Sequence, residues 1–105
     1  MKEIGTFKEL KNNNDKYPAF EATPNEIPEK KIILEYLEGT PSVAVAPAIV
    51  KDIFTGERLK MELFAKSDGI YIWSSDIAYY FDKYNLKLPK EFIEHVLKQK
   101  KRATF

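Results

Sequence analysis

Hydrophobic residues recur at helical spacing in some segments of the chain and at every second position in others, and each spacing predicts a different kind of element. Ile33, Tyr36 and Leu37 recur at helical spacing and predict an amphipathic helix from Pro28 to Gly39. Pro28 suits a first helical turn, where an N–H is not needed, and Gly39 suits a left-handed residue that closes a helix. Both ends of this helix are therefore marked by residue type.

Period-two patterns dominate the middle of the chain and predict three strands in an antiparallel meander. They span residues 43–54, 59–65 and 70–73, with turn signals at Thr55-Gly56 and Ser67-Asp68-Gly69. Pro47 cannot donate to a strand ladder, so the first of these strands is expected at a sheet edge or at a bulge.

Alternation also assigns side chains to the two faces of this sheet. Leu63 and Ile72 share one face, while Phe64, Tyr71 and Trp73 share the other. Leu59, Met61, Leu63 and Ile72 form a side without charge, so we expect the helices to cover that side. The aromatic side also carries charged residues, so it is either covered by something else or is a site.

Two further helices end the chain, one running from the capping residues Ser74 and Ser75 to about Asn85 and one over about 90–100. Residues 1–26 are polar and irregular and are interpreted as an N-terminal arm pinned by apolar side chains. Residues 27–105 then form a single α+β domain, a three-stranded antiparallel meander packed with about three helices.

Composition narrows the classes of function. The formal net charge is +1, so no overall field draws the chain to nucleic acid or to an anionic membrane. Its longest apolar run, Val43 to Val50, is too short to span a bilayer. The chain has no cysteine, which excludes thiolate chemistry and agrees with a cytoplasmic location.

No residue pattern assembles a catalytic, cofactor or metal site. His95 is the only histidine and lies outside any metal-binding spacing. Asp68, Asp76 and Asp82 each have a structural explanation, in a turn, at a helix start and in an ion pair. The four glycines are scattered, so no phosphate-binding loop is expected and we assign no cofactor.

Aromatic residues crowd into the second half of the chain and carry the site hypothesis. Tyr80, Phe81 and Tyr84 are expected in the core, and Tyr79 points away from their helix stripe. We expect a protein partner to contact seven side chains: Phe64, Tyr71, Trp73, Tyr79, Glu62, Asp76 and Asp82. Single-stranded nucleic acid is a weaker candidate, because few basic residues accompany the rings.

The order of turns and rings from Asp68-Gly69 through Trp73, Tyr79-Tyr80, Leu88-Pro89 and His95-Val96 resembles a pattern in small uncharacterised bacterial proteins. Some of these are similar to immunity proteins of polymorphic toxin systems. The resemblance covers about residues 43–97 and assigns no catalytic residue. It implies a protein that binds a cognate toxin, with acidic side chains facing a basic toxin surface.

A second hypothesis comes from another class of protein. A small enzyme or ligand-binding domain could use a pocket near Asp76, His95 and the tyrosines. A pocket joining His95 to a carboxylate would favour this alternative. A structural or regulatory subunit is a third possibility.

Overall fold

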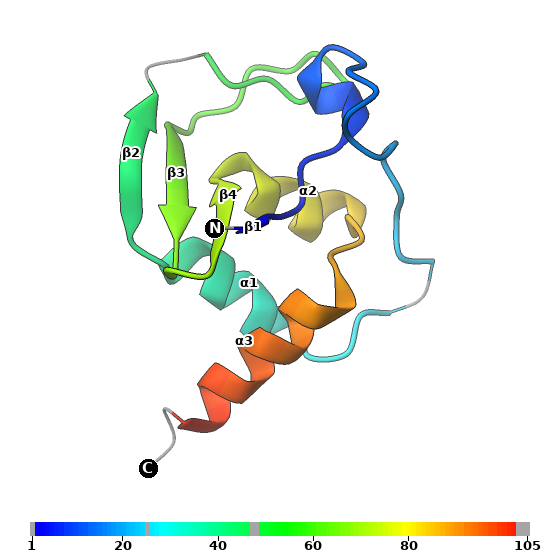
Figure 1. The fold of residues 1–105 in the computed structure, drawn as a ribbon. Helices are drawn as coiled ribbons and strands as arrows, with labels where there is room; N and C mark the ends of the chain where they lie inside the picture. The colour runs from blue at the N-terminus through cyan, green and yellow to red at the C-terminus, as the bar shows by residue number, and fades with distance from the viewer. Residues whose placement is uncertain (1, 25, 47–48, 103–105) are drawn as a thin grey trace.

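The computed structural model describes residues 2–24, 26–46 and 49–102. It is an α+β fold in which three helices pack on a four-stranded sheet (Figure 1). In chain order the elements are β1 (Lys2–Glu3), a 3-10 helix η1 (Lys8–Lys11), α1 (Lys30–Gly39), β2 (Ser42–Ala46), β3 (Leu63–Ser67), β4 (Tyr71–Ser74), α2 (Asp76–Tyr84) and α3 (Lys90–Arg102).

The sheet has the order β1-β4-β3-β2 and is mixed. Strands β2, β3 and β4 form the expected antiparallel meander, with Ala65 opposite Ser74 and Val45 opposite Phe64. The strand β1 adds a parallel partner to β4, through the Lys2 and Ile4 amides, which donate to carbonyls of β4 and its preceding turn. The prediction of a three-stranded, purely antiparallel sheet is therefore wrong in this detail. The strand β1 has only two residues, which are too few to show a hydrophobic period in the sequence.

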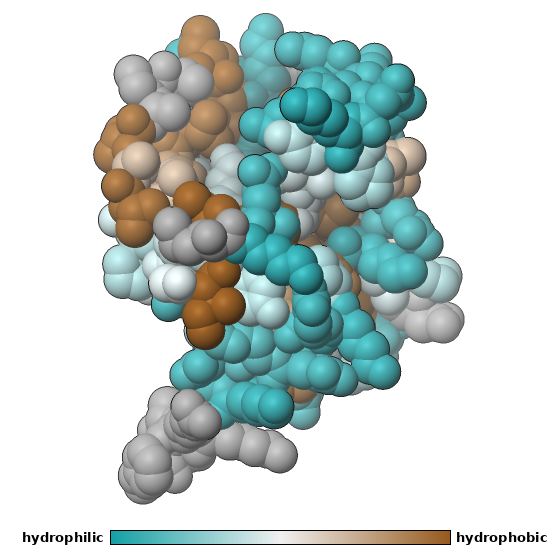
Figure 2. Space-filling view, viewed as in Figure 1, coloured by the Kyte–Doolittle hydropathy of each residue, from teal (hydrophilic) through white to brown (hydrophobic). Residues whose placement is uncertain are grey.

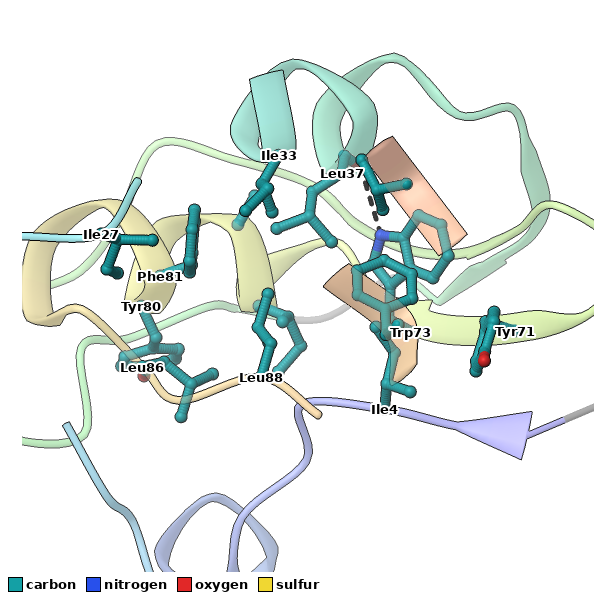
Figure 3. Packing of buried hydrophobic residues seen from close by; sticks show 14 of the residues in the cluster. Ile4, Ile27, Ile33, Leu37, Tyr71, Trp73, Tyr80, Phe81, Leu86 and Leu88 are labelled. Carbon is teal, nitrogen blue, oxygen red and sulfur yellow. Dashed lines mark hydrogen bonds between the residues drawn. The ribbon is translucent and has the colours of Figure 1, made fainter. Parts of the chain in front are cut away.

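The helices cover the aromatic side of the sheet, which corrects the expectation that they cover the uncharged side. Tyr71 is 8% exposed and Trp73 1% exposed, and both lie among the buried hydrophobic residues drawn in Figure 3. Both rings pack against Phe92 of α3. Leu63 and Ile72, on the other side, are only partly buried. Two large aromatic rings remove more apolar area from water than the aliphatic side chains opposite, and this burial decides the face.

A hydrogen bond joins the core ring to the first helix. The Trp73 indole Nε1 donates to the Leu37 carbonyl at 3.2 Å, drawn as the dashed line in Figure 3. Lys66 lies on the same sheet face, and its ammonium donates to the Glu38 carbonyl at 2.6 Å and the Thr40 carbonyl at 3.2 Å. A charge on the covered face is thus accommodated at the C-terminus of α1, where carbonyls attract cations.

The first two helices end where the sequence predicts, at Gly39 and near Asn85, but their caps differ in part from the expected ones. Asn85 adopts the left-handed conformation (φ 55°) that ends α2. Gly39, the last residue of α1, has no positive φ, so the expected left-handed closure is wrong; Thr40 caps the helix instead, and its hydroxyl donates to the Tyr36 carbonyl. The Ser75 side chain makes no cap; its hydroxyl donates to the Glu62 carbonyl and accepts the Phe64 amide, which joins β3 to α2.

The N-terminal arm belongs to the core. Ile4 and Phe7 are 2% and 1% exposed and pack in the same hydrophobic cluster as Trp73 and α2. Gly5 lies between them with φ +78°, and a Cβ built there would lie 2.5 Å from Cγ2 of Ile77. A glycine is needed at this point because α2 approaches the arm backbone closely.

Residues 49–62 form a loop where the sequence predicts parts of two strands. An isolated antiparallel bridge joins Lys51 to Arg58, around the predicted turn at Thr55-Gly56. Strand β2 is a sheet edge, as expected, with its irregularity between Ser42 and Ala44. Pro47, on which that expectation rested, lies outside the described residues.

We expect Trp73→Phe to lower the free energy of unfolding by about 2–4 kcal/mol, because it leaves a cavity and an unpaired Leu37 carbonyl. Urea denaturation followed by circular dichroism measures this loss. Ile70→Ala, at a side chain that is 55% exposed, is the control and should change stability by less than about 0.5 kcal/mol. Equal losses in the two variants would contradict the assigned core.

Gly5→Ala should destabilise the protein by about 1–3 kcal/mol, through the positive φ and the contact with Ile77. Gly39→Ala is the matched control, since Gly39 has nothing within 4 Å of its built Cβ and an ordinary φ. The control should be neutral or slightly stabilising, because alanine favours a helix. Thermal unfolding of both variants compares them, and a neutral Gly5→Ala would show that the arm does not pack as described.

Candidate functional site

The structure divides the seven predicted contact residues into two groups. Tyr71, Trp73 and Asp76 are buried, at 8%, 1% and 6% exposure, so they are not available to a partner and their assignment is corrected. The two rings are core because helices cover their sheet face. The other four residues, Glu62, Phe64, Tyr79 and Asp82, line one open groove.

This groove, of about 560 Å³, lies where the helices leave the covered face of the sheet open. Leu34 and Glu38 of α1 form one wall, and Tyr79 and Asp82 of α2 contribute to another. Phe64 of β3 lies at its sheet side. The remaining boundary is the chain from Leu59 to Glu62, which precedes β3. The groove therefore collects residues from three separate parts of the sequence.

A buried carboxylate holds the wall of the groove in place. Asp52 is fully buried, and its Oδ2 accepts hydrogen bonds from the hydroxyls of Tyr79 and Tyr84, each at 2.6 Å. Its Oδ1 accepts the Phe54 amide at 2.8 Å and the Thr55 amide at 3.1 Å. The loop of residues 49–58 is thereby tied to α2, and the Tyr79 ring is fixed at the edge of the groove.

These contacts set the charge of Asp52. Burial by itself would raise the pKa of Asp52, but the hydrogen bonds from the two tyrosines and the two amides outweigh burial and hold this pKa well below its usual range. The hydrogen bond to Asp52 raises the pKa of Tyr79, so this hydroxyl stays protonated and donates. Lys83 adds an ion pair, with its Nζ 3.6 Å from Asp52 Oδ2 and 3.2 Å from the Tyr79 hydroxyl.

The sequence reasoning missed Asp52. It falls within the range read as a strand, and its tyrosine partners lie 27 and 32 residues further along the chain. An available signal was the acidic residue two positions before Phe54 and three before Thr55, a spacing at which an Asp side chain accepts local amides in a turn. That signal predicts the turn and not the tyrosines.

His95 is joined to a carboxylate, though to Asp68 and not to Asp76. His95 Nε2 lies 2.8 Å from Asp68 Oδ2, which also accepts the Tyr36 hydroxyl at 2.5 Å. Asp68 Oδ1 accepts the amides of Ile70 and Tyr71, the turn role expected from the sequence. Burial opposes ionisation, yet these hydrogen bonds lower the pKa of Asp68. The cluster ties the β3–β4 turn to α1 and α3.

Asp76 is the buried carboxylate with the opposite electrostatic character. Burial raises its pKa, and hydrogen bonds from Ser74 and its own amide offset this only in part. Its Oδ1 has no hydrogen-bond partner among the described residues. The ionised form of Asp76 is therefore stabilised mainly by its position in the first turn of α2, where the helix dipole favours a negative charge.

A second surface is apolar. Val43 and Val45 of β2 are 58% and 66% exposed, and Ile49, Ile53 and Phe54 of the following loop are also exposed. Figure 2 shows hydrophobic residues gathered along the side of the molecule where Figure 1 places β2 and that loop. Phe54 packs one side of its ring near Tyr84, with the ring centroids 4.9 Å apart, and so is held in place.

No protein-family model matches the chain. Searches of curated proteins and of solved structures also returned no match. The resemblance to immunity proteins therefore rests on the residue pattern alone. Within residues 2–24, 26–46 and 49–102, no helix has the length and apolar character to cross a membrane, and no three His, Asp or Glu side chains are grouped as metal ligands.

Asp52→Asn should destabilise the protein near pH 7 by about 1–3 kcal/mol, because the hydroxyls of two partly buried tyrosines, Tyr79 and Tyr84, lose a charged acceptor. Since the folded pKa of Asp52 lies below the unfolded value of about 3.9, the contribution is present above that pH and disappears as the pH falls through the folded pKa. The stability difference from wild type should therefore shrink on acidification below about pH 4.

The comparison variant is Asp76→Asn, for which the sign reverses. The folded pKa of Asp76 is raised, so ionised Asp76 costs stability once the pH exceeds the unfolded value. Wild type should therefore lose stability relative to this variant as the pH rises. Urea titrations from about pH 3 to pH 7 test both variants, and parallel profiles would contradict the assigned environments.

Proposed function

We propose that the chain is a non-catalytic protein-binding domain and that the groove between α1, β3, α2 and residues 59–62 is its docking site. The observation that carries this proposal is the convergence of Glu62, Phe64, Tyr79 and Asp82 on one groove. An aromatic pair on an apolar floor with a charged rim has the make-up of a protein contact site.

The supports of the groove favour binding by a rigid surface. Tyr79 is held by Asp52 and Lys83, and β3 is held to α2 by the Ser75 hydroxyl. Side chains that are ordered before binding lose less conformational entropy when a partner arrives. The groove is thus organised in the free protein.

The specific form of the proposal is an immunity protein that neutralises a cognate bacterial toxin by direct binding. The support is the spacing of turns and rings over residues 43–97, together with acidic side chains at the groove. Such a protein acts by occluding its partner, which requires shape and charge and no catalytic group.

The enzyme alternative has less support from the geometry. His95 is paired with Asp68 and Tyr36, and both oxygens of Asp68 accept hydrogen bonds within the fold. The groove is lined by neither His95 nor Asp76. The His95 cluster therefore acts as a structural tie in this arrangement.

Photo-crosslinking in the native host tests the docking site. Glu62, which is exposed at the groove, is replaced by p-benzoylphenylalanine, and the same replacement at exposed Lys16 on the arm serves as the control. We expect one major protein crosslinked from position 62 and absent from position 16. Crosslinks at neither position, or the same products at both, would count against the proposal.

The toxin form makes a further demand on the crosslinked protein. Produced alone, it should arrest growth, and co-production of the wild-type chain should restore growth. If the crosslinked protein does not arrest growth, the chain can still be a binding domain, but the immunity role is refuted.

A further inference from the structure

We propose that the occupant of the groove is a basic amphipathic segment of a partner protein, with arginine or lysine side chains facing Glu38, Glu62 and Asp82. This inference rests on the proposed function and names the chemistry of the partner. It depends on three features of the groove: its floor, its uncompensated charges and its rings.

The floor of the groove is apolar. Leu34 of α1, Ala78 of α2 and Phe64 of β3 line it, and Leu59 and Met61 extend it along the preceding chain. All five of these side chains are buried or partly buried. A segment that covers them must present apolar side chains of its own, because burying polar groups there would leave them unpaired.

The rim of the groove carries uncompensated negative charge. Glu38, Glu62 and Asp82 are exposed, and none forms an ion pair within the part of the chain that the structure describes. Of the two cations at the groove, Lys66 is committed to the carbonyls at the end of α1. Lys60 and Lys66 together carry less charge than the three carboxylates, so the lining of the groove keeps a net negative charge and favours a cationic partner.

The rings add a second reason for a cation. Lys83 Nζ lies 5.6 Å from the centroid of the Tyr79 ring, so a cation of the chain itself already contacts this ring. Phe64 provides another ring in the same groove. Arginine suits such a place best, because its planar group stacks on rings and binds carboxylates through two hydrogen bonds.

Two synthetic amphipathic peptides test this inference on the full chain. They share the same leucine positions, and one carries arginine where the other carries glutamate. Each is titrated into isotope-labelled protein while amide signals are followed by nuclear magnetic resonance. We expect the arginine peptide to shift the signals of Glu62, Phe64 and Tyr79, and the glutamate peptide to leave them unchanged.

Matched charge variants separate the rim from overall charge. The variant Glu38→Gln/Glu62→Gln/Asp82→Asn should weaken binding of the arginine peptide by about tenfold or more. The variant Glu26→Gln/Glu35→Gln/Glu94→Gln, at exposed sites outside the lining of the groove, changes the net charge equally and should retain the affinity.

Several outcomes would overturn the basic occupant: equal shifts from both peptides, no shift with the arginine peptide, or equal weakening by the two variants. Concentration-dependent changes of the groove signals without peptide would assign the groove to a second copy of the chain instead. If crosslinking from position 62 captures a partner while the arginine peptide fails, the protein-binding role stands and only the inference on charge is lost.

Discussion

Burial of the Trp73 ring beneath α1 and α3 is the constraint on which the rest of the molecule depends. The ring is 1% exposed, its Nε1 is bonded to Leu37, and it sets the sheet face on which the helices pack. That one face then has two parts. Over β4 it is closed and forms the core, whereas over β3 it stays open at Phe64 and becomes the floor of the groove. The core and the proposed docking groove thus share one sheet face, divided by how far the helices reach.

The buried carboxylate of Asp52 solves a different problem, which is how to hold a long loop against a helix. Four hydrogen bonds keep it ionised without a buried partner cation, since Lys83 is exposed. Their combined strength also fixes Tyr79, so the loop that presents Ile53 and Phe54 and the wall of the groove are connected through one side chain. A partner that binds at Tyr79 would contact side chains that are already ordered, so binding would cost less conformational entropy.

The seven residues expected at a binding site divide into a buried group and a group at the groove, and this division has a physical reason. Large rings on a strand are equally suited to a core and to an interface, and the pattern of the chain does not say which part of a sheet face a helix will cover. Tyr71 and Trp73 lie on β4 and were covered, while Phe64 lies on β3, the neighbouring strand on the side of β2. Asp76 was buried as the first residue of α2, whereas Asp82 lies about two turns later on the exposed side.

The sequence by itself determined the α+β class, the three helices with their approximate bounds, the meander and the shared face of Phe64, Tyr71 and Trp73, because each follows from local periods and end signals. Only the tertiary structure decided which face the helices cover, that residues 2–3 add a parallel strand, and that Asp52 meets Tyr79 and Tyr84. These outcomes depend on contacts between segments far apart in the chain, where burial area and the pairing of buried polar groups compete, and no local pattern records that competition.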